Sequence, residues 1–400
     1  MQEKICIMGL GYIGLPTAAL LATKGYAVHG VDVKPEVVDI INRGKIHIVE
    51  PELDAFVKSA VQSGNLKASL KPDYADIFMI SVPTPIDKKN DPDITYVIEA
   101  TKAITPYVRE NNVVILESTS PVGTTEKVAK ILKEKGNAKD FYIAYSPERV
   151  LPGQTMRELV ENDRIVGGMT EEASKRVQKF YKTFVHGEVL ITNSRTAEMS
   201  KLTENACRDV NIAFANELSI LCDKFGINVW ELISLANRHP RINILKPGSG
   251  VGGHCIAIDP WFIVAEGKDD ARIIRTAREV NNRKPKWVVE KVEQAIQEYK
   301  QKNKKDPVVA CMGIAFKPDI DDLRESPSLH IVQDLIAKGM HVLIAEPNVK
   351  KHSGFVLTDY TEAVSKSDII LFLVAHKQFK DLSIPADKVV IDICGVRSNY

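Results

Sequence analysis

The chain has 400 residues, of which 44% are hydrophobic and 26% are charged, a composition typical of a globular protein of two or three domains. Lys and Arg number 53 against 52 for Asp and Glu, so the formal net charge of +1 gives no overall field that would draw the protein to nucleic acid or an anionic membrane. The amino end leads directly into a strand pattern, and no apolar stretch is long enough to span a bilayer. We therefore expect a cytoplasmic protein.

The six cysteines, at positions 6, 207, 222, 255, 311 and 394, are scattered along the chain without a Cys-x-x-Cys pair. This spacing argues against a disulfide framework and against a zinc site. We expect six thiols and no bound metal.

The first half of the chain alternates strand and helix patterns, which predicts a parallel sheet covered on both faces. Each predicted strand is a short, mostly apolar run, as expected for a strand that is buried on both sides. These strands are Lys4–Met8, Ala27–Val31, Ile77–Val82, Val113–Glu117 and Tyr142–Tyr145.

A Gly-x-Gly-x-x-Gly turn follows the first of these strands and leads into a helix. Gly9 allows the tight turn, Gly11 lets the backbone approach a pyrophosphate, and Gly14 permits close helix packing. Asp32, after the next strand, is placed to bind an adenosine ribose and to repel a 2'-phosphate, which favours NAD over NADP. The alternative is a plain tight turn between strand and helix. The candidate cofactor contacts in this turn are Gly9, Gly11, Tyr12, Ile13 and Gly14.

Two threonines follow later strands of the same predicted sheet. Thr84 lies in Ser-Val-Pro-Thr-Pro and Thr119 in Ser-Thr-Ser-Pro-Val-Gly. Both loops would lie at the carboxyl edge of the sheet, so we expect both threonines near the nicotinamide. Either could instead be a turn-forming hydroxyl.

The middle of the chain has helical periodicity. One helix is predicted from about Thr196 to Lys224, with Gly226 as its stop signal. Asn228 then resembles an amino-terminal cap for Val229–Asn237, and a further helical run covers residues 270 to about 302, interrupted by Pro285.

The last hundred residues return to strand and helix alternation. The predicted strands are Val308–Gly313, His341–Ala345, Ile369–Val374 and Val389–Ile393, with a helix over Ser328–Lys338. Because the turn after the first of them lacks the Gly-x-Gly-x-x-Gly pattern, we expect no second dinucleotide there, although a nucleotide-like partner remains possible. The predicted fold is α/β, with two doubly wound (Rossmann-like) domains joined by a central helical domain. The expected boundaries are 1–193, 194–300 and 301–400.

Lys201, Asn205 and Arg208 share one stripe of the long central helix. Such a stripe is often a solvated helix face. Asn has a poor helix propensity, however, and hydrogen-bond donors that face a developing oxyanion would explain its place in the middle of a helix.

Cys255 follows the glycine-rich stretch that begins at Gly248. It could be a small buried apolar residue, but the glycines allow a ligand to approach the backbone closely. A thiolate is a competent nucleophile toward an aldehyde if Lys201 or Arg208 supplies nearby positive charge. Asp259 could orient the thiol or a water molecule.

With these motifs together, the chain resembles the UDP-glucose/GDP-mannose dehydrogenase family over essentially its full length. The resemblance rests on the turn from Gly9 to Pro16, Ser146–Gly153, Lys201 with Asn205, Gly252–Cys255 with Asp259, and Gly313–Pro327. Within the family, residues 237–241 and 254–262 are most similar to UDP-N-acetyl-D-mannosamine dehydrogenases.

The resemblance implies an NAD-dependent, four-electron oxidation of the C6 alcohol of a UDP-sugar to a carboxylate, with Cys255 as carrier of a thiohemiacetal and then a thioester. UDP-N-acetyl-D-mannosamine is the expected substrate, and UDP-N-acetylglucosamine, UDP-N-acetylgalactosamine and UDP-glucose are alternatives. The family also implies a homodimer or dimer-based oligomer formed through the central domain. The implied catalytic residues are Cys255, Lys201, Asn205, Glu148 and Asp259, and the implied substrate contacts are Arg149, Val150, Lys201, Asn205, Arg208, His239, Arg241, Gly252 and Lys317. Arg324 would approach the cofactor.

The sequence departs from the family pattern at Pro152. UDP-glucose enzymes carry a second glutamate at that place, which is proposed there as the base for thioester hydrolysis. Glu148 and Asp259 are the remaining candidates for that base in this chain, and Glu148 is preferred for its reach. Two other functions stay open, a two-electron hydroxyacid dehydrogenase and a non-catalytic NAD-dependent sensor.

Overall fold

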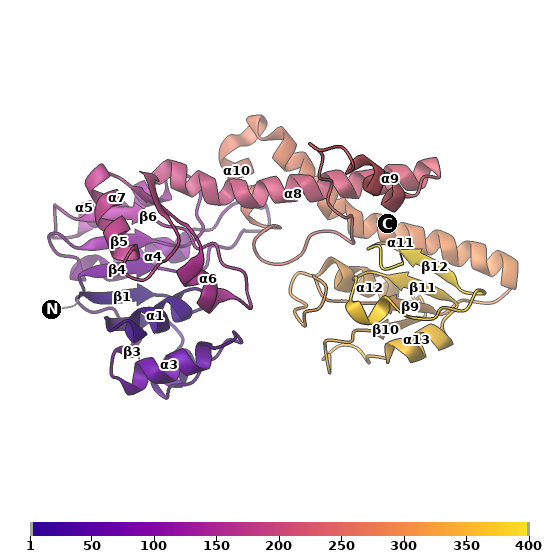
Figure 1. The fold of residues 1–400 in the computed structure, drawn as a ribbon, viewed down its shortest axis with the longest axis horizontal. Coiled ribbons are helices and arrows are strands. Elements are labelled where there is room, and N and C mark those ends of the chain that lie inside the picture. The colour runs from indigo at the N-terminus through magenta and orange to yellow at the C-terminus, as the bar shows by residue number, and fades with distance from the viewer. Residues whose placement is uncertain (1–2, 398–400) are drawn as a thin grey trace. The chain divides into compact units, whose positions relative to one another are not determined.

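The computed structural model describes residues 3–397. The chain divides into two compact units, one of residues 1–204 with 261–266 and the other of residues 205–260 with 267–400. Figure 1 shows a layered α/β arrangement in each unit. The predicted fold class is confirmed, whereas the three-domain division at 193/194 and 300/301 stays a prediction.

The first unit contains an eight-stranded sheet in the order β3-β2-β1-β4-β5-β6-β7-β8. All neighbouring strands are parallel except β6 and β7, which pair antiparallel. The strands are β1 (Lys4–Met8), β2 (Ala27–Val31), β3 (Leu66–Ser69), β4 (Ile77–Ile80), β5 (Val113–Leu116), β6 (Tyr142–Tyr145), β7 (Arg164–Gly168) and β8 (Val189–Asn193). The five predicted strands are present, and β3, β7 and β8 were missed by the sequence patterns.

Successive side chains of each strand point to opposite faces of the sheet, and in β4 and β5 both sets are apolar. Helices therefore cover both faces. Ile5, Ile77 and Val113 pack on one face against α1 and α3. Cys6 and Phe78 pack on the other face against α4 and α5. The helices of this part of the chain are α1 (Gly14–Thr23), α2 (Pro35–Asn42), α3 (Leu53–Gln62), α4 (Thr95–Ile104), η1 (Thr105–Tyr107), α5 (Thr124–Lys135), α6 (Thr155–Glu161) and α7 (Glu171–Tyr181).

The central part of the chain is helical, as predicted. It consists of α8 (Ser194–Phe225), α9 (Val229–Ala236), α10 (Asp259–Gly267), η2 (Lys268–Asp270) and α11 (Arg272–Asn303). Gly226 ends α8 in a left-handed conformation at φ +69°, and the Asn228 side chain accepts hydrogen bonds from the amides of Trp230 and Glu231, so both predicted helix signals are confirmed.

The predicted interruption at Pro285 is wrong, because α11 continues through this residue. Proline removes one backbone donor from a helix. Here Lys284 before the proline and Val288 and Val292 after it are buried, so packing on both sides holds the helix together. Tertiary packing thus outweighs the helix-breaking tendency of Pro285.

The second unit contains a four-stranded parallel sheet in the order β10-β9-β11-β12. The elements of this part of the chain are β9 (Val309–Met312), α12 (Pro327–Ala337), β10 (Val342–Ala345), α13 (Tyr360–Lys366), β11 (Ile369–Phe372), η3 (Lys377–Phe379) and β12 (Val389–Asp392). Val309 and Leu371 pack with α11 and α12 on one face, while Met312 and Phe372 pack with α13 on the other. All four predicted strands are present.

Candidate active site

The turn after β1 has the geometry that a bound pyrophosphate requires. Gly9 has φ +92°, and its N–H donates to Val31 O at 2.8 Å. A Cβ on Gly14 would lie 1.8 Å from Gly9 O, so only glycine fits there. A Cβ on Gly11 would have no atom within 4 Å, which leaves that side of the turn open to a ligand. The residues of this turn therefore fit the diphosphate of NAD, which amides at a helix start bind well.

Asp32 follows β2 and is half-buried. Its carboxylate accepts hydrogen bonds from Leu10 N at 3.1 Å and from Lys34 N at 3.0 Å. These two bonds fix the carboxylate beside the glycine turn, where a ribose hydroxyl could reach its remaining lone pairs. Its predicted role as a contact of the adenosine ribose stays a prediction.

Thr84 and Thr119 lie in loops that follow β4 and β5, which are neighbours in the sheet. The Ser118 hydroxyl donates to Val82 O at 2.7 Å and so joins the two loops. Both threonines are half-buried at the carboxyl edge. Their assignment as cofactor contacts stays a prediction.

Glu148 belongs to a buried charge cluster that sequence reasoning did not find. The Arg164 guanidinium, at the start of β7, lies 2.6 Å from Glu148 Oε2 and 3.9 Å from Glu117 Oε1. Arg149 N donates to the other Glu148 oxygen at 2.7 Å. Burial raises the pKa of Glu117 above its ordinary value, against the opposing effect of Arg164. The cluster fixes the position of the Glu148 carboxylate.

Two contacts position the loop after Glu148. Arg149 forms an ion pair with Glu204 at 2.9 Å. Glu50, which is buried, accepts hydrogen bonds from Gly153 N at 3.0 Å and from Thr155 N at 2.8 Å. Val150 lies half-buried between these anchors in the sequence. Glu50 had no signal in the local sequence, because its partners are about a hundred residues away. Arg164 had none either, because Glu148 and Glu117 lie on other segments.

Lys201 and Asn205 lie one turn apart on the uninterrupted helix α8, and both are half-buried. Asn205 Nδ2 donates to Asp259 Oδ2 at 2.5 Å, and Asp259 is only 4% exposed. The structure thus joins two predicted catalytic residues that are far apart in the sequence.

Cys255 is exposed at the end of the glycine-rich loop. Its carbonyl accepts hydrogen bonds from Ile258 N at 3.0 Å and from Asp259 N at 2.9 Å. The thiol is therefore attached to a backbone turn that leads directly into α10. The same turn carries Asp259, so the cysteine and the Asn205–Asp259 pair form one local group.

The remaining predicted substrate contacts are mostly solvent-facing. Arg208, His239, Arg241 and Lys317 are exposed. Gly252 is different, because a Cβ there would lie 2.5 Å from Glu325 O. Arg324, the remaining predicted cofactor contact, forms an ion pair with Asp322 at 2.6 Å.

The turn after β9 repeats the backbone geometry of the turn after β1. Gly313 also has φ +92°, and its N–H donates to Ala345 O at 2.8 Å. Glu346 here takes the place of Asp32, but it is 5% exposed and accepts from Ile314 N at 2.8 Å, Ala315 N at 3.0 Å and His376 Nε2 at 3.0 Å. The amides of this turn are occupied by the chain's own carboxylate.

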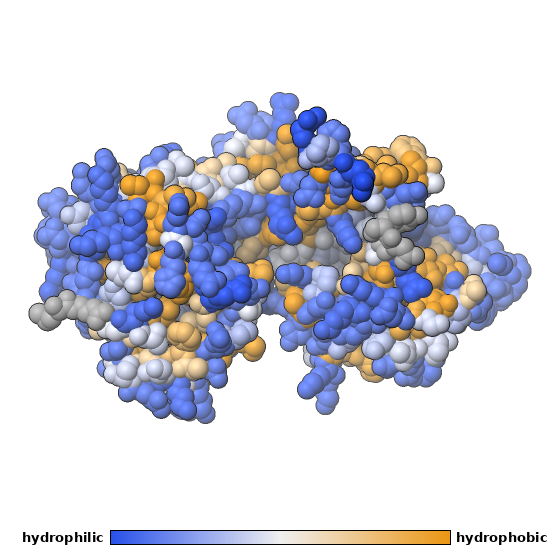
Figure 2. Space-filling model, viewed as in Figure 1, coloured by the Kyte–Doolittle hydropathy of each residue, from blue (hydrophilic) through white to orange (hydrophobic). Residues whose placement is uncertain are grey.

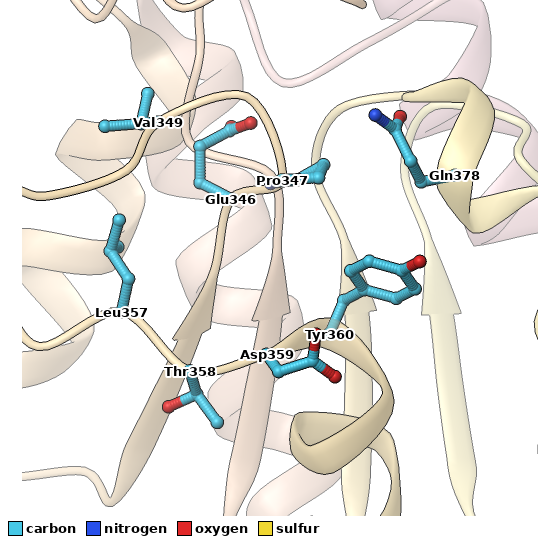
Figure 3. Close-up of a pocket in the computed structure, with 8 residues that line it drawn as sticks. All are labelled: Glu346, Pro347, Val349, Leu357, Thr358, Asp359, Tyr360 and Gln378. Atoms are coloured by element: carbon cyan, nitrogen blue, oxygen red, sulfur yellow. The ribbon is translucent and has the colours of Figure 1, made fainter.

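A cavity of about 340 Å³ lies beside Glu346. Figure 3 shows Glu346 and Pro347 on one side of it, with Tyr360 and Gln378 from two other elements. Asp359 at its edge caps α13 by accepting from Thr361 N and Glu362 N. The carboxylates of Glu346 and Asp359 are thus both engaged within the protein.

Comparison with known proteins identifies the chain through three family models. The UDP-glucose/GDP-mannose dehydrogenase family models match its NAD binding domain at residues 3–185, its central domain at 195–283 and its UDP binding domain at 310–399. The chain belongs to the UDP-glucose/GDP-mannose dehydrogenase family. The predictions of the family, of NAD as cofactor and of a nucleotide-sugar dehydrogenase are confirmed.

Several members of this family are similar to the chain over nearly its whole length. The UDP-N-acetyl-D-mannosamine dehydrogenase of Campylobacter jejuni is 54% identical, over 97% of this chain and 98% of that protein. The NDP-N-acetyl-D-galactosaminuronic acid dehydrogenase of Ralstonia nicotianae is 51% identical, over 98% of this chain and 96% of that protein. The solved structure of the UDP-D-ManNAc dehydrogenase of Pyrococcus horikoshii is 38% identical, with a TM-score of 0.88 over 99% of this chain and 96% of that chain.

No helix within residues 3–397 combines the length and the apolar character needed to cross a bilayer. This finding agrees with the hydropathy of the sequence.

Proposed function

We propose that the protein oxidises the C6 alcohol of UDP-N-acetyl-D-mannosamine to UDP-N-acetyl-D-mannosaminuronate. The observation that carries this proposal is the exposed Cys255 on the turn that also holds Asp259 and, through it, Asn205. A hydroxyacid dehydrogenase or an NAD-dependent sensor would have no need of this nucleophile. Full-length similarity to proteins named UDP-N-acetyl-D-mannosamine dehydrogenase supports the choice of sugar.

The chemistry needs one covalent carrier and two oxidations. NAD, when bound, accepts the hydride that leaves C6 in each oxidation. After the first, the Cys255 thiolate adds to the aldehyde carbon, a C–S bond forms, and the carbonyl oxygen takes a proton to give a thiohemiacetal. The second oxidation removes the C6 hydrogen as hydride and the hydroxyl proton, which leaves a thioester. Water then forms the new C–O bond, the C–S bond breaks, and the thiolate and the carboxylate product are released.

Lys201 and Asn205 are the proposed partners of the C6 oxygen. An ammonium and an amide N–H stabilise the negative charge that develops on that oxygen during thiolate addition and during attack of water. Lys201 also serves as the acid or base at this oxygen. The Asn205–Asp259 hydrogen bond fixes the orientation of the amide, because its NH₂ group must face the carboxylate.

Glu148 is the proposed base that activates the hydrolytic water, and Asp259 is the second candidate. Arg164 and Arg149 N hold the two Glu148 oxygens, and Oε1, unlike the buried Oε2, is the oxygen proposed to accept a hydrogen bond from water. Asp259 lies four residues after Cys255 but already accepts from Asn205 Nδ2 at 2.5 Å. Single-turnover experiments on Glu148→Gln and Asp259→Asn separate the two, because loss of the base alone allows both hydride transfers and stops at the thioester.

The proposal keeps the other predicted ligand contacts. Arg149, Val150, Arg208, His239, Arg241, Gly252 and Lys317 bind the UDP-sugar. Gly9, Gly11, Tyr12, Ile13, Gly14, Asp32, Thr84, Thr119 and Arg324 bind NAD.

To test the proposal, purified protein and NAD are mixed with each of three substrates in turn, and the NADH formed per sugar is measured. The substrates are UDP-N-acetylmannosamine, UDP-N-acetylgalactosamine and UDP-glucose. We expect two NADH per sugar with the first substrate, and no carboxylate from Cys255→Ser. The galactosamine substrate is included because a similar protein is named for that sugar. A single NADH with the product stopping at the aldehyde would contradict the reaction, and a preference for another sugar would contradict only the substrate.

The central helices also support the proposed homodimer. Three apolar residues, Phe214, Leu221 and Phe225, are 39–64% exposed and share one stripe of α8. Figure 2 shows apolar surface over the carboxyl end of α8 and α9, where Leu235 is 65% exposed. A contiguous exposed apolar surface of this kind marks an interaction site. A second copy of the chain is its proposed occupant.

Light scattering of the purified chain tests the dimer. The wild type should have twice the mass of the chain, and Phe214→Glu combined with Phe225→Glu should be monomeric. Val356→Glu is the control, because Val356 is 88% exposed and lies elsewhere in the second unit. A monomeric wild type would refute the dimer.

A further inference from the structure

The glycine-rich loop that carries Cys255 is held at its start by a chain of buried side-chain amides. Gly248 N donates to Asn216 Oδ1 at 2.9 Å, and Asn216 Nδ2 donates to Asn281 Oδ1 at 2.9 Å. Asn281 Nδ2 donates to Asp209 Oδ1 at 2.8 Å, and Arg278 forms an ion pair with the same oxygen at 2.6 Å. These four side chains are at most 2% exposed.

The direction of this chain is fixed by its two ends. The backbone N–H of Gly248 can only donate, so the oxygen of Asn216 must face it. The Asp209 carboxylate, beside Arg278, can only accept, so the NH₂ group of Asn281 must face it. Each amide therefore has one allowed orientation, and a buried network satisfied in this way holds its members rigidly.

Further contacts fix the loop between Gly248 and Cys255. The Ser249 hydroxyl donates to Leu373 O at 2.8 Å, and Ser249 is 6% exposed. A Cβ on Gly250 would lie 3.1 Å from the Pro327 side chain, and one on Gly252 would lie 2.8 Å from the same ring. The loop is glycine-rich because its backbone packs directly on its neighbours, and it is therefore held in place despite its composition.

We propose that Asn216 and Ser249 are positioning residues that align the Cys255 thiol for capture of the aldehyde. Neither residue belongs to the proposed substrate or cofactor contacts. Their bonds fix the backbone on which the nucleophile is carried, and a small displacement of a nucleophile lowers the effective molarity of an intramolecular reaction steeply. The inference rests on the proposed role of Cys255 as covalent carrier.

The experiment compares Asn216→Ala and Ser249→Ala with Asn211→Ala. Asn211 lies on the same helix and is exposed, and its Nδ2 donates to Cys207 O at 2.7 Å and to Cys207 Sγ at 3.6 Å, so Asn211→Ala is the control for turnover and not for thiol labelling. We expect both test variants to keep the first oxidation but to release several-fold more aldehyde per carboxylate, with lower kcat and little change in KM. Asn211→Ala should match the wild type.

A second measurement does not depend on turnover. Iodoacetamide labelling of Cys255, followed by mass spectrometry, reports the environment of the thiol, and the exposed Cys207 is an internal reference in the same molecule. We expect the ratio of the two labelling rates to change at least twofold in Asn216→Ala or Ser249→Ala. If Asn216→Ala fails to fold, Ser249→Ala carries both measurements.

Unchanged aldehyde release and an unchanged labelling ratio in the folded variants would overturn the inference. A rise in aldehyde release that is absent from Asn211→Ala supports it, and so does a change in the labelling ratio relative to the wild type. Failure of the proposed function looks different, because Cys255→Ser would then still produce carboxylate. If Cys255→Ser stops at the aldehyde while the positioning variants behave as wild type, only the positioning role is wrong.

Discussion

The turn after β1 and the turn after β9 have similar backbone geometry, but the acidic residue beside each turn is bonded differently. In both, a glycine at φ +92° donates to the last residue of the next strand, and an acidic residue follows that strand. Asp32 is half-buried and accepts from one amide of its turn. Glu346 is buried and accepts from two amides of its turn and from His376.

This difference is the structural reason to expect a dinucleotide at the first turn and not at the second. Free amides at a helix start attract an anion. In the first turn Leu10 N donates to Asp32, and a Cβ on Gly11 would have no atom within 4 Å, which leaves space for a ligand beside the backbone. In the second turn Glu346 supplies the anion from within the chain. Asp319 N donates to His376 Nδ1 at 3.0 Å, so the ring proton lies on Nε2 and points to Glu346.

The largest expected effect comes from the glycines of the first turn. Gly14→Ala should destabilise the protein by about 3 kcal/mol or more and abolish NAD binding, because its Cβ would lie 1.8 Å from Gly9 O. Gly11→Ala should change stability by less than about 0.5 kcal/mol, since its Cβ meets nothing, yet weaken NAD about tenfold, or about 1.4 kcal/mol. Calorimetry and NAD titration measure the two effects. Equal destabilisation by both variants would contradict the distinction between packing and ligand approach.

Substitution of Glu346 should mainly affect stability, whereas substitution of Asp32 should mainly affect NAD binding. Glu346→Ala should lower the free energy of unfolding by about 3 kcal/mol, because it leaves buried donors without an acceptor, and should leave NAD affinity unchanged. Asp32→Ala should cost less than Glu346→Ala, because only one of its two amide partners, Leu10 N, belongs to a buried residue while Lys34 is exposed, but it should weaken NAD. Thermal unfolding and NAD titration of both variants test this. Weaker NAD binding in Glu346→Ala would break the comparison.

The smallest effect concerns pH. Burial raises the pKa of Glu346. The hydrogen bonds from His376 and from the amides of Ile314 and Asn348 lower it by more, so the pKa lies below its ordinary value of 4.5. A carboxylate with a lowered folded pKa contributes stability that is fully present above the unfolded value and is lost as the pH falls through the folded one. The stability difference between wild type and Glu346→Gln should therefore be constant from pH 7 to 5 and shrink below about 4.5. A difference that grows on acidification would show that the carboxylate is not held ionised.

Sequence reasoning predicted the fold class correctly because its signals are local. Strands such as β4 and β9 are continuous apolar runs, and the caps at Gly226 and Asn228 depend on the conformational preference of one residue. β7 was missed because it begins with Arg164, a residue that pattern analysis places on the surface. Its burial depends on Glu148 and Glu117, which lie on other segments.

The same limit applies to the site. The sequence marked Asn205 and Asp259 separately, and only the fold brings them to 2.5 Å. It marked the glycine-rich loop as one that a ligand can approach closely, whereas only the fold shows that Asn216 on α8 and the Ser249–Leu373 hydrogen bond hold the loop in place. The helix break expected at Pro285 was wrong for the same reason, since its buried flanks outweigh one lost hydrogen bond.

The sequence by itself determined the glycine turn after β1, the absence of its pattern after β9, and the thiol that defines the proposed chemistry. A turn that has no room for a Cβ, and a nucleophile that must be cysteine, are properties of single positions. Only the tertiary structure decided which carboxylates are buried and what each one binds. Glu148 meets Arg164, Glu346 meets His376 and Asp209 meets Arg278. Burial and charge pairing depend on residues that folding brings together, and no local pattern contains them.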